Sequence, residues 1–517
     1  MRIPLPELAQ RKQPGESEQR LGVVDLGSNS FRLVEFTWVA GEWWKRTDEL
    51  YDAVRIGAGM GAERMLTTAR IGQALSTIQA YSQFSRATGL QEISTVATSA
   101  IRDASNRESF LARATAVSGL DIRVLSPEDE AYYGYLAACN STNLQSGSVL
   151  DLGGGSLQLV DVEDRKARAL RSWPLGAVRM TEQFMAEPDT SPKQVRALRK
   201  HVVAELAASG VTPHGQQLVA LGGAVRNLAT AAQRIEGGPA FGVQGFELSL
   251  ATLELLIEQL ASLPASERGS VRGIKPERAD IILAGAVTVA AALDATGCDS
   301  LTVTEAGLRE GIFFERLLAD ESHLFADVRR SSVLNLCGQY HADTVHVEHV
   351  AKLAHQLHDS LAVASVFTPA SDERELLWAS AMLHDIGTAV DYDDHHKHSR
   401  YLIINAGLPG FSPREVALIA QVARYHRKGD PKPGWLEPLF ISGDNQLLLR
   451  CSAIMRICEQ LERSRDQAVE SVTAKAGKDG SVELELHGAE TSVAKWAASR
   501  QAALFERAFG KRLTIAD

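Results

Sequence analysis

Two short segments rich in glycine and serine each begin with an aspartate. They read Asp25-Leu-Gly-Ser-Asn-Ser30 and Asp151-Leu-Gly-Gly-Gly-Ser156. Glycine lets the backbone approach a ligand closely, and successive N–H groups bind phosphate oxygens. A carboxylate beside them can hold Mg²⁺ through its water shell. We therefore predict metal-binding aspartates at both positions and a phosphate-binding set that contains Gly27, Ser28, Asn29, Ser30, Gly153, Gly154, Gly155 and Ser156.

The elements around these two loops are repeated. Each loop lies between two alternating apolar segments, which predicts a β-hairpin, and the second aspartate follows the first by 126 residues. Two further matches, ending in Arg55 and Arg179 and in Arg102 and Arg226, keep nearly the same offset. Three ordered matches indicate a duplicated half-domain. We expect two facing α/β lobes with one loop on each wall of a cleft; two simple tight turns are the alternative.

An acidic segment supplies a candidate base. The segment Ser126-Pro-Glu-Asp-Glu130-Ala131 lies at a predicted strand-to-helix junction. Phosphoryl transfer needs an oriented water and neutralised oxygen charge, and a carboxylate such as Glu130 can hold that water. The alternative is an acidic helix N-terminus favoured by the helix dipole. Arg32, Arg102 and Arg278 are candidate phosphate contacts, because arginine binds such oxygens in a bidentate way; surface ion pairing is their alternative.

These segments resemble the exopolyphosphatase / guanosine pentaphosphatase family, within the acetate kinase–sugar kinase–heat-shock–actin superfamily. The resemblance covers about residues 20–465 and rests on VVDLGSNSFRLV (23–34), ATSAIRDASN (97–106), VLSPEDEA (124–131), VLDLGGGSLQLV (149–160), PLGAVRMTE (174–182) and GLREGIF (307–313). Three later segments resemble the longer, proteobacterial-type members: AMLHDIG (381–387), HKHSRYLIINAGLPGF (396–411) and VARYHRK (422–428).

The resemblance implies Mg²⁺-dependent hydrolysis of the end phosphate of inorganic polyphosphate, of guanosine pentaphosphate, or of both. It implies that Glu130 is the catalytic base and that Asp25, Glu130, Asp151 and position 158 surround the metal, Asp151 being catalytic too. Gln158 stands where the family has a carboxylate, so either Mg²⁺ binds less tightly or the three acidic residues suffice. Pro127 replaces a usual glycine. A monovalent cation such as K⁺ and a homodimer are further expectations.

The C-terminal half has a helical pattern from about residue 320. Its order of histidine and acidic residues is that of HD-type phosphohydrolases, in which His346, His384, Asp385 and Glu459 would surround a divalent metal. Further histidines add to this set: His395, His396, His398 and His426. The alternative is an HD-like domain that has lost its metal and helps to bind long substrate.

We therefore predict a duplicated actin-like (ribonuclease H-like) two-lobed ATPase fold, an all-α HD-like domain and a small α+β C-terminal domain. The expected ranges are a flexible arm at 1–19, lobe I at 20–134, lobe II at 135–318, the helical domain at 319–465 and the small domain at 466–517. The last is expected to contain a strand at 481–487 and a helix at 493–509.

Composition limits the classes of function. A net charge of −10 argues against a broad nucleic-acid surface, so a polyanionic substrate requires a locally basic groove. The longest apolar run, from Ile281 to Leu293, has 13 residues and is too short to span a bilayer. The polar N-terminus lacks the apolar core of a secretory signal. Five cysteines without C-x-x-C spacing suit a reduced, cytoplasmic setting.

An exopolyphosphatase is the leading functional hypothesis, and guanosine pentaphosphate hydrolysis is its near alternative. A sugar or carboxylate kinase is a second class, since Leu221-Gly-Gly-Ala224 resembles an adenosine-binding segment. The GLREG and acidic motifs favour a hydrolase over that kinase. A non-catalytic nucleotide or polyphosphate sensor is a third class. Gln158 supports it, whereas Glu130 and the two loops argue against it.

Overall fold

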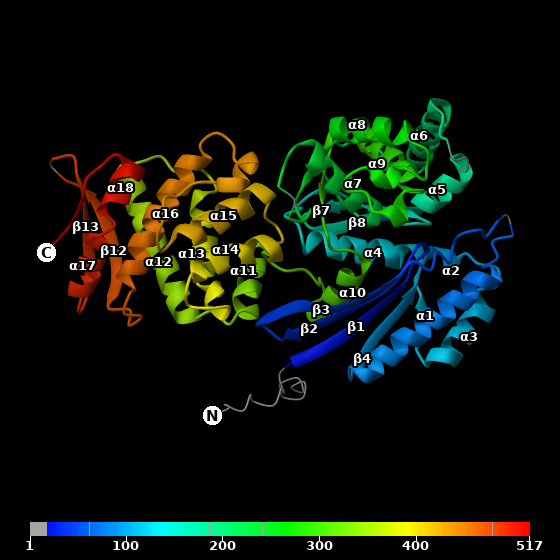
Figure 1. Cartoon of the computed structure of the whole chain (residues 1–517), viewed down its shortest axis with the longest axis horizontal. Coiled ribbons are helices and arrows are strands. Elements are labelled where there is room, and N and C mark those ends of the chain that lie inside the picture. Colours follow the sequence, from blue (N-terminus) through cyan, green and yellow to red (C-terminus); the bar gives the residue numbers. More distant parts are fainter. Residues whose placement is uncertain (1–17, 62, 186–188, 240, 478, 517) are drawn as a thin grey trace, which may run out of the picture.

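The computed structural model describes residues 18–61, 63–185, 189–239, 241–477 and 479–516. Two α/β lobes lie at one end of the molecule, and a helical body with a small sheet lies at the other (Figure 1). Of the arm predicted at residues 1–19, residues 1–17 lie outside the described residues, and Glu18 and Gln19 belong to the first strand.

The two lobes contain sheets with the same strand order. The order is β3-β2-β1-β4-β5 in lobe I and, in the matching direction, β8-β7-β6-β9-β11-β10 in lobe II. Among the strands in the described residues, only β10 lacks a counterpart. Their bounds are β1 (Glu18–Leu26), β2 (Phe31–Val39), β3 (Trp43–Asp52), β4 (Glu92–Ala97), β5 (Ile122–Val124), β6 (Gly147–Leu152), β7 (Leu157–Glu163), β8 (Lys166–Trp173), β9 (Gln217–Leu221), β10 (Glu247–Ser249) and β11 (Ser300–Val303). The predicted duplication is confirmed.

The duplication extends to the register of the strands. Asp25 on β1 lies opposite Arg32 on β2, and Asp151 on β6 lies opposite Gln158 on β7. The register between the second and third strand also shifts once in each lobe, at equivalent points: Glu35/Phe36 and Asp161/Val162. Gln158 therefore occupies in lobe II the place that Arg32 occupies in lobe I.

Helices cover both sheets and fill the space between them. Those of lobe I are α1 (Thr68–Ala87), α2 (Ser99–Arg102) and α3 (Arg107–Ser118), and those of lobe II are α5 (Ala177–Phe184), α6 (Pro192–Ala208), α7 (Gly223–Ile235), α8 (Leu250–Ala261) and α9 (Ile282–Thr296). Two more, α4 (Pro127–Cys139) and α10 (Leu308–Leu317), pack between the lobes in a shared apolar core (Figure 1). There Phe313 of α10 stacks on Phe36 of β2 with ring centroids 4.3 Å apart.

The long apolar run of the sequence forms α9, whose residues Ile282 to Leu293 are all buried in the core of lobe II. No helix in the described part of the chain combines the length and apolar character needed to cross a membrane. All five cysteines are buried free thiols.

The helical body contains α11 (Val328–Gln339), α12 (Thr344–Val363), α13 (Glu373–Leu383), α14 (His395–Ala406), α15 (Pro413–Tyr425) and α16 (Asp444–Leu461). It shares one hydrophobic core with the C-terminal elements: β12 (Val469–Ala476), β13 (Val482–Gly488), α17 (Ser492–Ser499), α18 (Ala502–Phe509) and β14 (Leu513–Ile515). The single helix predicted at 493–509 is therefore two short helices, and two strands join the predicted one. The body contacts lobe I, where the Trp44 amide donates to Asn335 Oδ1 at 2.7 Å.

Candidate active site between the two lobes

The two predicted phosphate loops face one cavity of about 150 Å³ between the lobes. They also touch each other, because a Cβ atom on Gly155 would lie 2.5 Å from Ser99 Oγ and 3.0 Å from Ser28 Oγ. Only glycine permits this approach. The predicted residues that line the cavity are Asp25, Gly27, Ser28, Asn29, Ser30, Arg32, Glu130, Asp151, Gly153, Gly154, Ser156, Gln158 and Arg278. Gly155 lines an adjoining cavity of about 280 Å³ instead.

Three carboxyl groups meet at this cavity, and Glu130 is buried while Asp25 and Asp151 are partly buried. Asp25 and Asp151 occupy equivalent positions near the ends of β1 and β6, and Glu130 lies in the first turn of α4. Burial raises the pKa of Asp25, raises that of Asp151 to about 6 and raises that of Glu130 to about 7. A hard divalent cation with oxygen ligands fits this set, since it would offset the charge that burial disfavours.

The start of α4 is well specified by the sequence. Ser126 Oγ accepts from the Asp129 amide at 3.0 Å, and Asp129 Oδ2 accepts from the Ser126 amide at 3.2 Å. Pro127 takes the first helical position, where its missing N–H removes no intrahelical hydrogen bond. The replacement of the usual glycine therefore preserves the helix start, which places Glu130 at the cavity.

Glu130 is held on both of its oxygens. Arg102 donates to Oε1, while Gln158 Nε2 donates to Oε2 at 3.0 Å and Ser156 Oγ donates to it at 3.3 Å. Arg102 also donates to the Leu125 carbonyl at 2.9 Å and does not line the cavity. In this structure Arg102 therefore positions the candidate base, and the amide nitrogen of Gln158 does so from the other lobe.

Arginines make the cavity locally basic in an acidic protein. The four that line it are Arg32, Arg226, Arg278 and Arg309. Arg32 pairs with Glu49, and Arg278 packs so closely on Gly223 that a Cβ atom there would lie 2.1 Å from its Nη2. Burial, followed by the neighbouring arginine charges, lowers the pKa of Arg226 to about 10. Four arginines are thus gathered at the cavity that also holds the three carboxyl groups.

Arg309 has no role in the sequence prediction, although the motif that contains it carries part of the family resemblance. Its Nη1 donates to Asp25 Oδ2 at 3.1 Å. Its Nε and Asn29 Nδ2 are buried donors for which the described residues supply no acceptor. Two such donors at one cavity fit an anionic ligand, because an unpaired buried polar group is costly.

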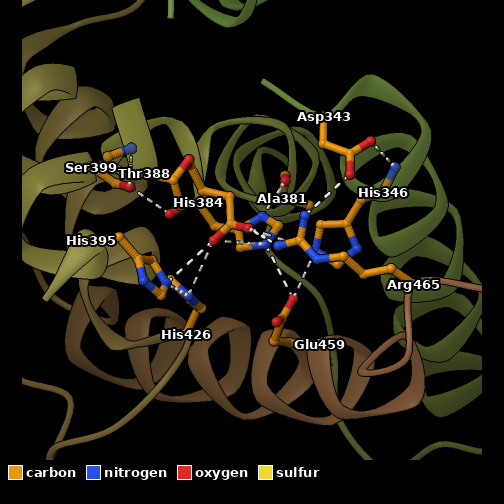
Figure 2. A network of polar contacts seen from close by, with 12 residues as sticks. Asp343, His346, Ala381, His384, Thr388, His395, Ser399, His426, Glu459 and Arg465 are labelled. Atoms are coloured by element: carbon orange, nitrogen blue, oxygen red, sulfur yellow. Dashed lines mark hydrogen bonds and ion pairs between the residues drawn. The ribbon is translucent and has the colours of Figure 1, made fainter. Parts of the chain in front are cut away.

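A second cluster of polar residues lies inside the helical body (Figure 2). The four residues of the predicted HD set come together there: His346 Nε2 and His384 Nε2 each lie 3.2 Å from Glu459 Oε2, and His346 Nε2 lies 3.9 Å from Asp385 Oδ2. His395 and His426 join the cluster on Asp385. Two groups thus share Asp385: His346 with His384, and His395 with His426.

The chain matches the model of the Ppx/GppA phosphatase family over residues 46–320 and that of Ppx/GppA phosphatase domain III over residues 328–501. It is similar to a Ppx/GppA family member of Aquifex aeolicus, with 28% identity and a TM-score of 0.51 over 57% of this chain and 96% of that chain. It is also similar to the Aquifex aeolicus PPX-GPPA enzyme, with 29% identity and a TM-score of 0.50 over 57% of this chain and 99% of that chain.

An exopolyphosphatase from Cytophaga hutchinsonii ATCC 33406 shares the fold, with 21% identity and a TM-score of 0.53 over 58% of this chain and 98% of that chain. These solved relatives correspond in size to the two lobes. The lobes have the actin-like α/β fold, and this chain belongs to the Ppx/GppA phosphatase family.

Proposed function

We propose that this protein is an exopolyphosphatase that uses Mg²⁺ and a water activated by Glu130 to remove the terminal phosphate of inorganic polyphosphate. The observation that carries the proposal is the cavity itself. Four arginines and two phosphate loops surround Glu130, Asp25 and Asp151 in a protein whose net charge is −10. Positive charge gathered at one cavity in an acidic protein fits a polyanion bound by its end.

The mechanism assigns a task to each group of the cavity, and Glu130 has two. Asp25, Glu130 and Asp151 would hold Mg²⁺, which when bound neutralises charge on the transferred phosphate. The loop N–H groups and the arginines orient the terminal phosphate. Ionised Glu130 accepts a proton from water as the water oxygen attacks phosphorus, and the bond from phosphorus to the bridging oxygen breaks. Arg102 and Gln158 keep the Glu130 carboxylate in place.

The adjoining cavity supports hydrolysis of guanosine pentaphosphate as a second candidate. It shares Ser28 and Gly154 with the phosphate site and is lined by apolar Met60 and Val178 together with carboxylate Glu182, among others. A purine ring fits beside apolar side chains, and guanine N–H groups donate to carboxylates. A nucleoside there would place its phosphates at the loops.

We further infer that the helical body is HD-like and helps to hold long polyphosphate. Several basic side chains lie on and around α14 and the end of α15: Lys397, Arg400, Arg424, Arg427 and Lys428. Lys397 and Lys428 both reach Asp394, which shows that the two segments lie together. A basic track of this kind binds polyanions in a salt-dependent way.

Phosphate release from long-chain polyphosphate, guanosine pentaphosphate and ATP, at matched concentrations with Mg²⁺, tests the proposal. We expect the highest kcat/KM on polyphosphate. The variant Met60→Trp narrows the adjoining cavity and should leave that value unchanged, and Met65→Trp at an exposed position is the matched control. If the protein instead hydrolysed guanosine pentaphosphate with the highest kcat/KM, and Met60→Trp lost this activity while Met65→Trp kept it, the second candidate would be established. Failure to hydrolyse any of the three substrates would refute both.

A further inference from the structure

Two histidines of the helical body, His395 and His426, place their Nε2 atoms directly against each other. His395 Nδ1 lies 2.8 Å from the Tyr392 carbonyl oxygen, and His426 Nδ1 lies 2.7 Å from the Ala423 carbonyl oxygen. A carbonyl oxygen only accepts, so each Nδ1 carries a proton. In the neutral form of each ring Nε2 is therefore unprotonated, and these two Nε2 atoms are 3.0 Å apart.

Two nitrogen lone pairs at that distance repel each other, whereas a cation that both nitrogens bind satisfies them. Asp385 supplies the third donor, since its Oδ1 lies 3.3 Å from His395 Nε2 and 3.9 Å from His426 Nε2. Ligand atoms about 2.1 Å from a tetrahedral metal lie roughly 3.4 Å from one another. Asp385, His395 and His426 thus already have the spacing of a metal site, and all three are buried.

A second set of donors lies on the other side of Asp385. His384 Nδ1 donates to the Ala381 carbonyl at 2.6 Å, so its Nε2 is the ring nitrogen that faces the cluster, and this Nε2 lies 3.2 Å from Glu459 Oε2. His346 Nε2 lies 3.2 Å from the same oxygen. Neither ring nitrogen of the buried His346 forms a hydrogen bond with any described residue. Figure 2 shows His346 and His384 pointing toward Glu459. His395 and His426 lie together at the opposite, left-hand side of the cluster.

We propose that the helical body binds two divalent first-row transition-metal cations with the Asp385 carboxylate between them. One is held by His395 and His426, and the other by His346, His384 and Glu459. This assignment goes beyond the single ion on four residues that the sequence predicts. Imidazole nitrogens with carboxylates suit ions such as Mn²⁺, Fe²⁺, Co²⁺ or Zn²⁺, whereas Mg²⁺ prefers oxygen ligands.

The proposed coordination also leaves a position for an exogenous ligand. The first cation receives donors from only three residues, which leaves a position for water or a phosphate oxygen, as in catalytic rather than structural sites. Arg465 lies at the edge of the cluster, where its Nη2 donates to Asp385 Oδ2 at 2.6 Å, and its side chain is 43% exposed. A guanidinium in that place can bind an anion that reaches the metals.

Metal content of the full-length protein tests the proposal. The protein is stripped with a chelator, reloaded with Mn²⁺ or Zn²⁺ while Mg²⁺ is present to occupy oxygen-only sites, desalted and measured by mass spectrometry of the elements. We expect about two transition-metal ions per chain. His355→Ala is the matched control on α12, because His355 Nε2 contacts the Arg374 carbonyl at 3.1 Å outside the cluster, and it should retain both ions.

The variants separate the two sites. His395→Gln with His426→Gln should retain about one ion per chain, His346→Gln with Glu459→Gln should also retain about one, and Asp385→Asn should weaken both. Circular dichroism confirms folding, and the rise in Tm on metal addition should be largest for the unsubstituted protein. A protein that binds no transition metal, or one ion that survives His395→Gln with His426→Gln, would overturn the two-cation proposal.

Discussion

Replacing Arg102 by methionine removes the guanidinium that faces the Glu130 carboxylate. Burial raises the pKa of Glu130 to about 7, and the Arg102 charge opposes that rise. A base acts only when ionised, so kcat/KM should fall about tenfold for each pH unit below about 7. An adjacent cation typically lowers a carboxyl pKa by about 1–3 units. Arg102→Met should therefore move this decline upward by about one pH unit or more and reduce kcat/KM roughly fivefold at pH 7.

The assay is phosphate release from polyphosphate well below KM, at constant Mg²⁺ and ionic strength, across the pH range from acidic to alkaline. Because the shift affects only the ionised fraction, the alkaline plateau should change little. Arg107→Met is the control, since Arg107 is partly exposed and pairs with the exposed Glu108. If kcat/KM of Arg102→Met declined at the same acidic pH as that of the original protein, or fell by the same factor at every pH, Glu130 would not be the group whose ionisation controls the rate.

Three further variants test other parts of the structure. Gln158→Glu should lower the Mg²⁺ concentration for half-maximal rate, because it adds a carboxylate beside Glu130; an unchanged requirement would show that position 158 does not act on the metal. His384→Ala with Asp385→Ala should leave kcat on polyphosphate within about twofold of the original, as neither residue lines the interlobe cavity; loss of turnover in the folded variant would make the helical body catalytic. Phe313→Ala should cost about 3–5 kcal/mol of unfolding free energy in denaturant titrations, because Phe313 is fully buried against Phe36; a loss below about 1 kcal/mol would show that this core relaxes around the cavity.

The sequence predicted the parts of the structure that depend on local pattern. Alternating apolar residues around Asp25 and Asp151 specify hairpins, and the nearly constant offset of 124 to 126 residues between matching segments specifies equivalent lobes. The shared strand order and register confirm this. Ser126 and Pro127 likewise specify the start of α4 and hence the placement of Glu130.

Contacts between distant residues could not be predicted in the same way. Arg309 meets Asp25 across 284 residues of sequence, and no local pattern encodes that approach. The sequence predicted that Arg102 contacts phosphate. In the structure its guanidinium forms an ion pair with Glu130, because a buried carboxylate needs a partner. The order of histidines predicted an HD-like set, whereas the 3.0 Å approach of His395 and His426 depends on how α14 packs against α15.

The kinetics of Glu130→Gln test the central claim most directly. Loss of a positioned base typically reduces the rate by about 10²–10⁴-fold, so kcat on polyphosphate should fall by that factor while equilibrium binding of polyphosphate is retained. Glu128→Gln, in the same helical turn but outside the cavity, is the control and should keep the original kcat. A folded Glu130→Gln variant that keeps half or more of the original kcat would contradict the assignment of Glu130 as the base.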